Sequence, residues 1–170
     1  MMKIVSKLLL CAVIVLFSFT VNAQSGTGIG VHYGTDSQIG LTVLKFLSDR
    51  NQHAVNLILS APYKGFRASA LYEYHLRNHS ENIEVAGVGF FLGAGGHIGR
   101  YKTIGWYKEG PAISSANVVA VGVDATAGIE WKLPHVPILL SIDVHPFLDL
   151  NYMKQQPQIF DFGGSIRYFF

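Results

Sequence analysis

The sequence has little charge and almost no cysteine. Charged residues make up 14% of the 170 residues, against roughly 25% in a typical soluble domain, and Cys11 is the one cysteine. No stretch reaches the ~20 consecutive apolar residues that a transmembrane helix needs. No basic run is present that could neutralise the phosphates of a nucleic acid. These absences argue against a membrane-helix protein and against nucleic-acid binding, and the length fits one domain.

The longest apolar run lies at the N-terminus and is typical of a secretory signal peptide. Lys3 and Lys7 precede the apolar residues 8–21, and Val21-Asn22-Ala23 supplies small residues at positions −3 and −1 of a cleavage site. We therefore predict a signal peptide over residues 1–23, which directs secretion across the inner membrane, and a mature domain over residues 24–170.

The single cysteine lies inside this predicted signal peptide. Cys11 follows Leu10, whereas a lipidated cysteine follows a small residue, so we expect no lipid anchor. Cleavage would leave a mature chain without cysteine. That excludes a disulfide framework, a thiolate nucleophile and a zinc–thiolate site.

From Gly26 onward, apolar and polar residues alternate with a period of two, which is typical of β-strands with two different faces. This alternation predicts eight strands, at residues 26–34, 39–47, 54–61, 65–76, 88–98, 119–131, 138–148 and 160–170. The phase of the second strand stays open, because Leu44 and Lys45 fit either assignment poorly. Pro146 lies within the seventh strand and cannot donate to the ladder, so we expect it at a bulge or near the rim.

The face that points outward separates two classes of barrel. A secreted lipocalin-like barrel keeps its apolar face inside around a ligand, whereas a membrane barrel turns that face to lipid. Here the apolar face is nearly free of charge over roughly the 9–11 positions that a tilted membrane strand needs, and the other face is rich in small residues and sparse in charge. Aromatic residues collect toward strand ends, as in interfacial girdles; they include Tyr72, Tyr74, Trp131, Tyr168 and Phe170. We predict an all-β fold, an eight-stranded antiparallel up-and-down transmembrane β-barrel.

The two arginines of the strands fix the phase. With the faces inverted, Arg67 and Arg167 would meet lipid, at about 2–4 kcal/mol each near the midplane. An eight-stranded barrel has an interior that side chains just fill, so we expect a closed polar lumen and no open pore. The predicted lumen network consists of Arg67, Glu73, Asp124, Glu130, Asp143 and Arg167.

The end of the chain carries a resemblance to a known family. Residues 165–170 read Ser-Ile-Arg-Tyr-Phe-Phe, with Tyr168 and the terminal Phe170 in phase with the apolar face. This resembles the C-terminal signal of bacterial outer-membrane barrels, and residues 24–170 resemble the small outer-membrane protein A and X type barrels, as an uncharacterised branch. The resemblance implies location in the outer membrane of a Gram-negative bacterium. It also implies recognition of the last strand by the barrel assembly machinery, and contact with outer-membrane lipid and lipopolysaccharide as a monomer.

The residues of the inward face offer two kinds of chemistry. His32, His97 and His145 share the inward face, and three converging ligands could bind a metal, but inward histidines more often hydrogen-bond their neighbours, so we expect no metal and no cofactor. Some barrels of this size modify membrane lipid, and Ser141, Asp143 and His145 are the residues available for such a reaction. Residues two apart on one strand rarely form a triad, and no nucleophile-elbow motif is present, so we expect no catalysis.

The connection after the fifth strand is the longest and carries cations among aromatic residues. Arg100, Tyr101, Trp106 and Tyr107 form a possible extracellular binding loop; the alternative is that they anchor the barrel at lipopolysaccharide headgroups. The function expected from the sequence is a structural or surface-binding outer-membrane barrel. The alternatives are a lipid-modifying barrel enzyme and a secreted soluble ligand-binding barrel.

Overall fold

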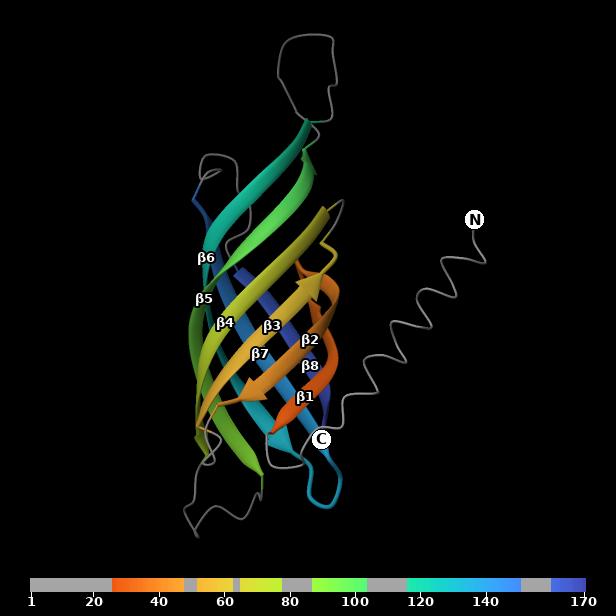
Figure 1. Ribbon diagram of the computed structural model, residues 1–170, viewed down its shortest axis with the longest axis vertical. Helices are drawn as coiled ribbons and strands as arrows, with labels where there is room; N and C mark the ends of the chain where they lie inside the picture. Colours follow the sequence, from red (N-terminus) through yellow and green to blue (C-terminus); the bar gives the residue numbers. More distant parts are fainter. Residues whose placement is uncertain (1–25, 48–51, 63–64, 78–86, 104–115, 151–159) are drawn as a thin grey trace, which may run out of the picture.

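The computed structural model describes residues 26–47, 52–62, 65–77, 87–103, 116–150 and 160–170. They form eight strands: β1 (Thr27–Gly34), β2 (Gln38–Phe46), β3 (His53–Ser60), β4 (Gly65–Arg77), β5 (Val88–Thr103), β6 (Ala116–Lys132), β7 (Ile138–Asp149) and β8 (Phe160–Phe169). Each strand pairs antiparallel with the next, and β8 pairs with β1, so the sheet is a closed barrel (Figure 1). The predicted fold class and strand count are confirmed. Within the described residues, no helix is long and apolar enough to cross a membrane.

Two strands are longer than the sequence pattern indicated. The β5–β6 ladder continues past Gly99↔Ala120 to Thr103↔Ala116, in a stretch that we predicted as part of a connection. This hairpin rises beyond the other strands at the end of the barrel opposite the C-terminus (Figure 1). The alternation of apolar and polar residues does not predict this extension, because Arg100 lies on the outward face, where the pattern expects an apolar residue.

The charged residues are distributed in the reverse of a water-soluble protein. Of the charged side chains that the structure describes, only Lys45, Arg100 and Lys132 are exposed, and Asp36 is half-buried. All the others point into the barrel and are buried; they are Arg67, Glu73, Asp124, Glu130, Asp143, Asp149, Asp161 and Arg167. The outer wall is made of aliphatic and aromatic side chains instead. The assignment of the apolar face to the outside is therefore correct, and it argues against a lipocalin-like arrangement.

The outward aromatic residues form two bands. Near the end that carries the C-terminus lie exposed side chains of β4, β5, β6 and β8, namely Tyr72, Phe90, Trp131 and Tyr168, with Phe170 just beyond. Near the other end lie Tyr33, Phe66, Phe160 and Phe162. Between the bands the outward residues are aliphatic or small, as in the lipid-facing belt of a membrane barrel.

The structure settles two local questions. In β2, Leu44 is fully buried inside the barrel and Lys45 is exposed outside. The phase of this strand was open in the sequence because Lys45 is a cation on the outward face, at the end of the apolar belt. Pro146 lies near the rim, paired with Phe160 at the start of β8, and it does not form a bulge. The strands β6 and β7 pair at Asp124↔Phe147 and again at Ala127↔Val144, three residues on along both strands. The register is kept and the ladder is only interrupted at the proline, which lacks an N–H.

Gly30 lies at the seam where β8 closes on β1. A Cβ there would overlap the carbonyl oxygen of Ile166 and lie 2.7 Å from the Cα of Arg167. Both are backbone atoms, so relief would require the two strands to move apart. The absence of a side chain at this position therefore allows the seam to close.

We expect Gly30→Ala to destabilise the barrel by about 1–3 kcal/mol, the usual range for overpacking. Urea unfolding of the refolded protein in detergent measures the effect. Gly164→Ala on β8 is the milder comparison and should cost less, because its Cβ would meet one backbone atom, the carbonyl oxygen of Ser141, at 2.9 Å. An equal loss in both variants would contradict the specific role of Gly30.

Candidate functional site: the polar lumen

The lumen nearer the C-terminal end is organised around His75 of β4. Its Nδ1 lies 2.9 Å from Glu130 Oε2 on β6, and its Nε2 lies 3.2 Å from Glu73 Oε2 on the same strand. Both carboxylates and the imidazole are almost fully buried. A neutral imidazole has one N–H, so both bonds form together only with an imidazolium or with one protonated carboxyl. Histidine here links strands that carry like charges.

Hydrogen bonds extend this cluster around the wall to four further strands. Asn56 Nδ2 donates to Glu73 Oε1 at 2.8 Å, and Thr42 Oγ1 donates to Asn56 Oδ1 at 2.8 Å. Arg167 Nε then donates to Thr42 Oγ1 at 3.1 Å, and its Nη1 donates to Ser141 Oγ at 3.2 Å. One connected network therefore joins β2, β3, β4, β6, β7 and β8, and it fixes the buried guanidinium of Arg167.

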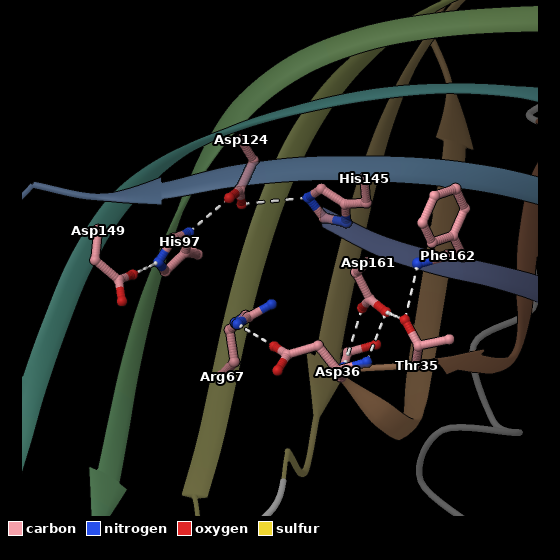
Figure 2. Close-up of polar contacts among 10 residues, drawn as sticks. Thr35, Asp36, Arg67, His97, Asp124, His145, Asp149, Asp161 and Phe162 are labelled. Carbon is pink, nitrogen blue, oxygen red and sulfur yellow. Dashed lines mark hydrogen bonds and ion pairs between the residues drawn. The ribbon is translucent and has the colours of Figure 1, made fainter. Parts of the chain in front are cut away.

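The half of the lumen at the opposite end has a second histidine between two acids (Figure 2). His97 of β5 lies 2.6 Å from Asp124 Oδ1 on β6 through Nδ1, and 2.6 Å from Asp149 Oδ1 on β7 through Nε2. The other oxygen of Asp124 lies 3.6 Å from His145 Nε2. These contacts join β5, β6 and β7 just below the point where β6 loses its pairing with β7.

An aspartate of β8 holds the short turn between β1 and β2. Asp161 accepts bonds from the backbone N–H groups of Asp36 and Ser37 at 2.8 and 3.0 Å, and from the hydroxyl of Thr35 at 3.1 Å. The same turn places Asp36 beside Arg67. The Nη2 atom of Arg67 lies 2.8 Å from the carboxylate of Asp36. The Arg67 guanidinium also lies 4.1 Å from the centre of the Phe147 ring. The closing seam and the β4 wall are thus connected at this end.

An apolar cluster fills the lumen beside the C-terminal end. Leu44, Phe46, Ala54 and Leu139 are buried together, and Phe169 packs against them. The ring of Phe46 meets the ring of His75 edge-on, with centroids 4.9 Å apart. The ring of Phe91 stacks on the ring of His75, with centroids 5.4 Å apart. The ionic cluster around His75 is therefore bounded by apolar side chains on this side.

All six residues predicted for the lumen network point into the barrel and are buried. They do not form one cluster. Glu73, Glu130 and Arg167 belong to the network around His75, whereas Arg67 and Asp124 lie in the other half. Asp143 interacts electrostatically with Arg167, and no hydrogen bond of its side chain connects it to either network among the contacts described.

Sequence reasoning missed the residues that make the connections. His75, Asn56, Thr42 and Asp149 all occupy inward positions of the period-two pattern. That signal identifies the face of a residue, but the partner on the next strand depends on register.

The candidate residues for metal binding and for lipid modification have the following contacts in the described part of the chain. No three His, Asp or Glu side chains there converge as metal ligands, and Nδ1 of His32 has no hydrogen-bond partner. Ser141 Oγ bonds Ser165 Oγ at 2.6 Å and Arg167, and no bond from it to His145 or Asp143 is present. The arrangement is that of side chains fixing one another.

The other predicted site residues lie on the outside or beyond the described part. Tyr168 and Phe170 are exposed at the end of β8, with ring centroids 5.4 Å apart. Arg100 is exposed on β5. The side chain of Tyr101, and all of Trp106 and Tyr107, lie outside the described residues, so the predicted binding loop stays a prediction.

We expect His75→Leu to lower the free energy of unfolding by about 3–5 kcal/mol, because it leaves two buried carboxylates without their shared partner. Urea unfolding in detergent is the measurement. Adding Glu130→Gln to His75→Leu removes one of these charges and should recover part of the loss. If the second substitution made the protein less stable still, the charge-matching role of His75 would be wrong.

Comparison with known proteins identifies the architecture. No protein-family model matches the sequence, and no curated protein matches it in sequence. Among solved structures, the chain is similar to the N-terminal β-barrel domain of OprF from Pseudomonas aeruginosa, with a TM-score of 0.67 and 14% identity over 86% of this chain and 98% of that one. Neisserial surface protein A is matched with a TM-score of 0.49 and 13% identity, over 86% and 96% of the two chains. The likeness to the OprF domain shows that this chain has the fold of the small eight-stranded barrels of the outer-membrane protein A and X type.

Proposed function

We propose that the protein is an integral outer-membrane β-barrel with a filled polar lumen and no catalytic activity. The observation that carries this proposal is the distribution of charge: buried ions inside, and an outer wall without exposed charge between the two aromatic bands. In water such a wall would be an exposed apolar surface all around the molecule, far larger than soluble monomers tolerate. In a bilayer it is the surface that lipid requires, and the closed sheet leaves no unpaired edge.

The proposal gives the barrel an orientation in the membrane. The C-terminus and the β6–β7 turn lie at one end, which we assign to the periplasm, and the extended β5–β6 hairpin rises at the other (Figure 1). The hairpin and its connection then face the outside, where they would serve a structural or surface-binding role and meet lipopolysaccharide. The exposed pair Tyr168 and Phe170 would be presented to the barrel assembly machinery, and residues 1–23 would be removed during export.

The experiment that tests the proposal is fractionation followed by gel mobility. We expect the protein in the outer-membrane fraction, and a different migration of boiled and unboiled samples on a denaturing gel, because a closed barrel resists detergent until it is heated. A soluble periplasmic protein without such a shift would overturn the proposal.

The lipid-facing wall gives a depth-dependent prediction. Ile166 lies outward on β8 between Phe162 of one aromatic band and Tyr168 of the other. We expect Ile166→Arg to destabilise the barrel in vesicles by about 2–4 kcal/mol, whereas the charge of Tyr168→Arg near the interface should cost about 0–1 kcal/mol. Urea unfolding in phosphatidylcholine vesicles compares the two. Equal costs at both depths would be inconsistent with a bilayer around this strand.

A further inference from the structure

A lysine interrupts the apolar outer wall at the end of β2. Lys45 is exposed on the outward face, because it stands between Leu44 and Phe46, which are buried in the lumen. Its partners on both neighbouring strands, Thr27 of β1 and Val55 of β3, share this face. The side chain of Lys45 therefore starts from the surface that the proposed function turns to lipid.

The register places Lys45 at the level of an aromatic band. Val55 pairs with Tyr72 of β4, and on the other side the backbone N–H of Phe170 donates to Thr27 O at 3.0 Å. Lys45 thus lies in one row between Tyr72 and Phe170, both part of the aromatic band at the end that carries the C-terminus (Figure 1). Such bands lie at the depth of the lipid headgroups, so the ammonium group of Lys45 is within reach of phosphate.

A histidine and a tyrosine beside Lys45 add a hydrogen-bond donor. Tyr72 Oη lies 2.7 Å from Nδ1 of the half-buried His53 on β3. The neutral pair has one N–H and one O–H; the bond between the two side chains uses one of these donors and leaves the other, whichever group donates. The backbone N–H of Leu47 donates to His53 O at 2.7 Å, which makes His53 a diagonal neighbour of Lys45 on the outward face.

No acidic side chain is exposed on the outward wall in the described part of the chain. The exposed charges there are Lys45, Arg100 and Lys132, all of them cations. Lys132 follows the inward phase, because it pairs with Leu139, which is buried in the lumen. A second copy of the chain would therefore bring no carboxylate from this wall to Lys45, whereas an anionic phospholipid carries its charge at headgroup depth.

We propose that Lys45, His53 and Tyr72 form a binding site for the phosphate of an anionic phospholipid in the periplasmic leaflet. The inference rests on the proposed insertion in the outer membrane. Lys45 supplies the positive charge, and the His53–Tyr72 pair donates a hydrogen bond to a phosphate oxygen. The acyl chains lie against the next outward residues, which are apolar; they are Ile29, Val43 and Leu57. A zwitterionic lipid fits less well, because Lys45 repels the cationic amine of its headgroup.

A tryptophan at position 57 reports on this site without replacing any residue that holds the phosphate. Leu57→Trp is combined with Trp106→Phe and Trp131→Phe, which remove both native tryptophans. Brominated acyl chains quench tryptophan fluorescence on contact. The protein is reconstituted in phosphatidylcholine vesicles that contain brominated phosphatidylglycerol or, at equal fraction, brominated phosphatidylcholine.

A second reporter controls for ordinary contact with lipid. Phe90→Trp, in the same background without native tryptophans, lies in the same aromatic band on β5. Phe90 pairs with Leu76 of β4 and Ile129 of β6, both apolar and exposed. The control reporter therefore meets lipid without a cation beside it.

We expect the relative binding constant at Leu57→Trp to favour phosphatidylglycerol by about fivefold, as one cation near an anionic lipid provides. Lys45→Gln should bring this ratio to about one. His53→Phe should lower it by about twofold, as the loss of one weak hydrogen bond does. Lys132→Gln removes an exposed cation at the same end of the barrel and should leave the ratio unchanged. Phe90→Trp should be quenched by both lipids without preference.

Three results would overturn the proposal. An equal preference at both reporters would show a general attraction of anionic lipid to the barrel. A ratio at Leu57→Trp that Lys45→Gln or His53→Phe leaves unchanged would show that these side chains do not hold the phosphate. Absence of quenching at both reporters would mean that the barrel is not embedded, and would overturn the proposed function together with the lipid site.

Discussion

Buried carboxylates inside the barrel outnumber the buried guanidinium groups, and histidine compensates. Six acidic side chains, Glu73, Asp124, Glu130, Asp143, Asp149 and Asp161, share the interior with Arg67 and Arg167. His75 lies between Glu73 and Glu130, and His97 lies between Asp124 and Asp149. Each histidine therefore contacts at least one acid on another strand. Because an unmatched buried charge costs several kcal/mol, the position of these two rings decides which strands can carry the acids. Most of the buried side chains among the described residues are polar or charged, so the packing of the lumen depends on this pairing.

The apolar outer surface follows from the burial of the charged side chains in the lumen. Once the ionic groups are satisfied within the lumen, the wall can be apolar over its full height, and the remaining exposed charges lie at strand ends. The ladder closes around the whole barrel, although the pairing of β6 with β7 is interrupted at Pro146 and ends at Gly122↔Asp149. Close approach of β8 to β1 at Gly30 completes the cylinder. An apolar wall around an ionic lumen is the arrangement that a bilayer stabilises.

Much of this fold could be predicted from the sequence, because a two-residue period directly reports which face of a strand meets which environment. The strands follow from that period, and the inward position of Arg67 and Arg167 follows from it together with the cost of placing an arginine in lipid. The upper part of β5 was missed since Arg100 stands where the apolar belt has already ended, and Lys45 obscured the phase of β2 for the same reason at the other end. The partners of His75 and His97 could not be found in this way. They lie 55 and 52 residues away in Glu130 and Asp149, and only the register of several successive ladders brings them together.

The most direct test of the account is the environment of alternate residues along one strand. The predicted mature chain has no cysteine, so single cysteines can be placed at each position from Phe66 to Leu76 of β4 and spin-labelled in vesicles. We predict that labels at Phe66, Ala68, Ala70 and Tyr72 are accessible to oxygen dissolved in the bilayer, and that those at Arg67, Ser69 and Leu71 are shielded from it. The opposite phase, or equal accessibility along the strand, would contradict an apolar wall in lipid around an ionic lumen.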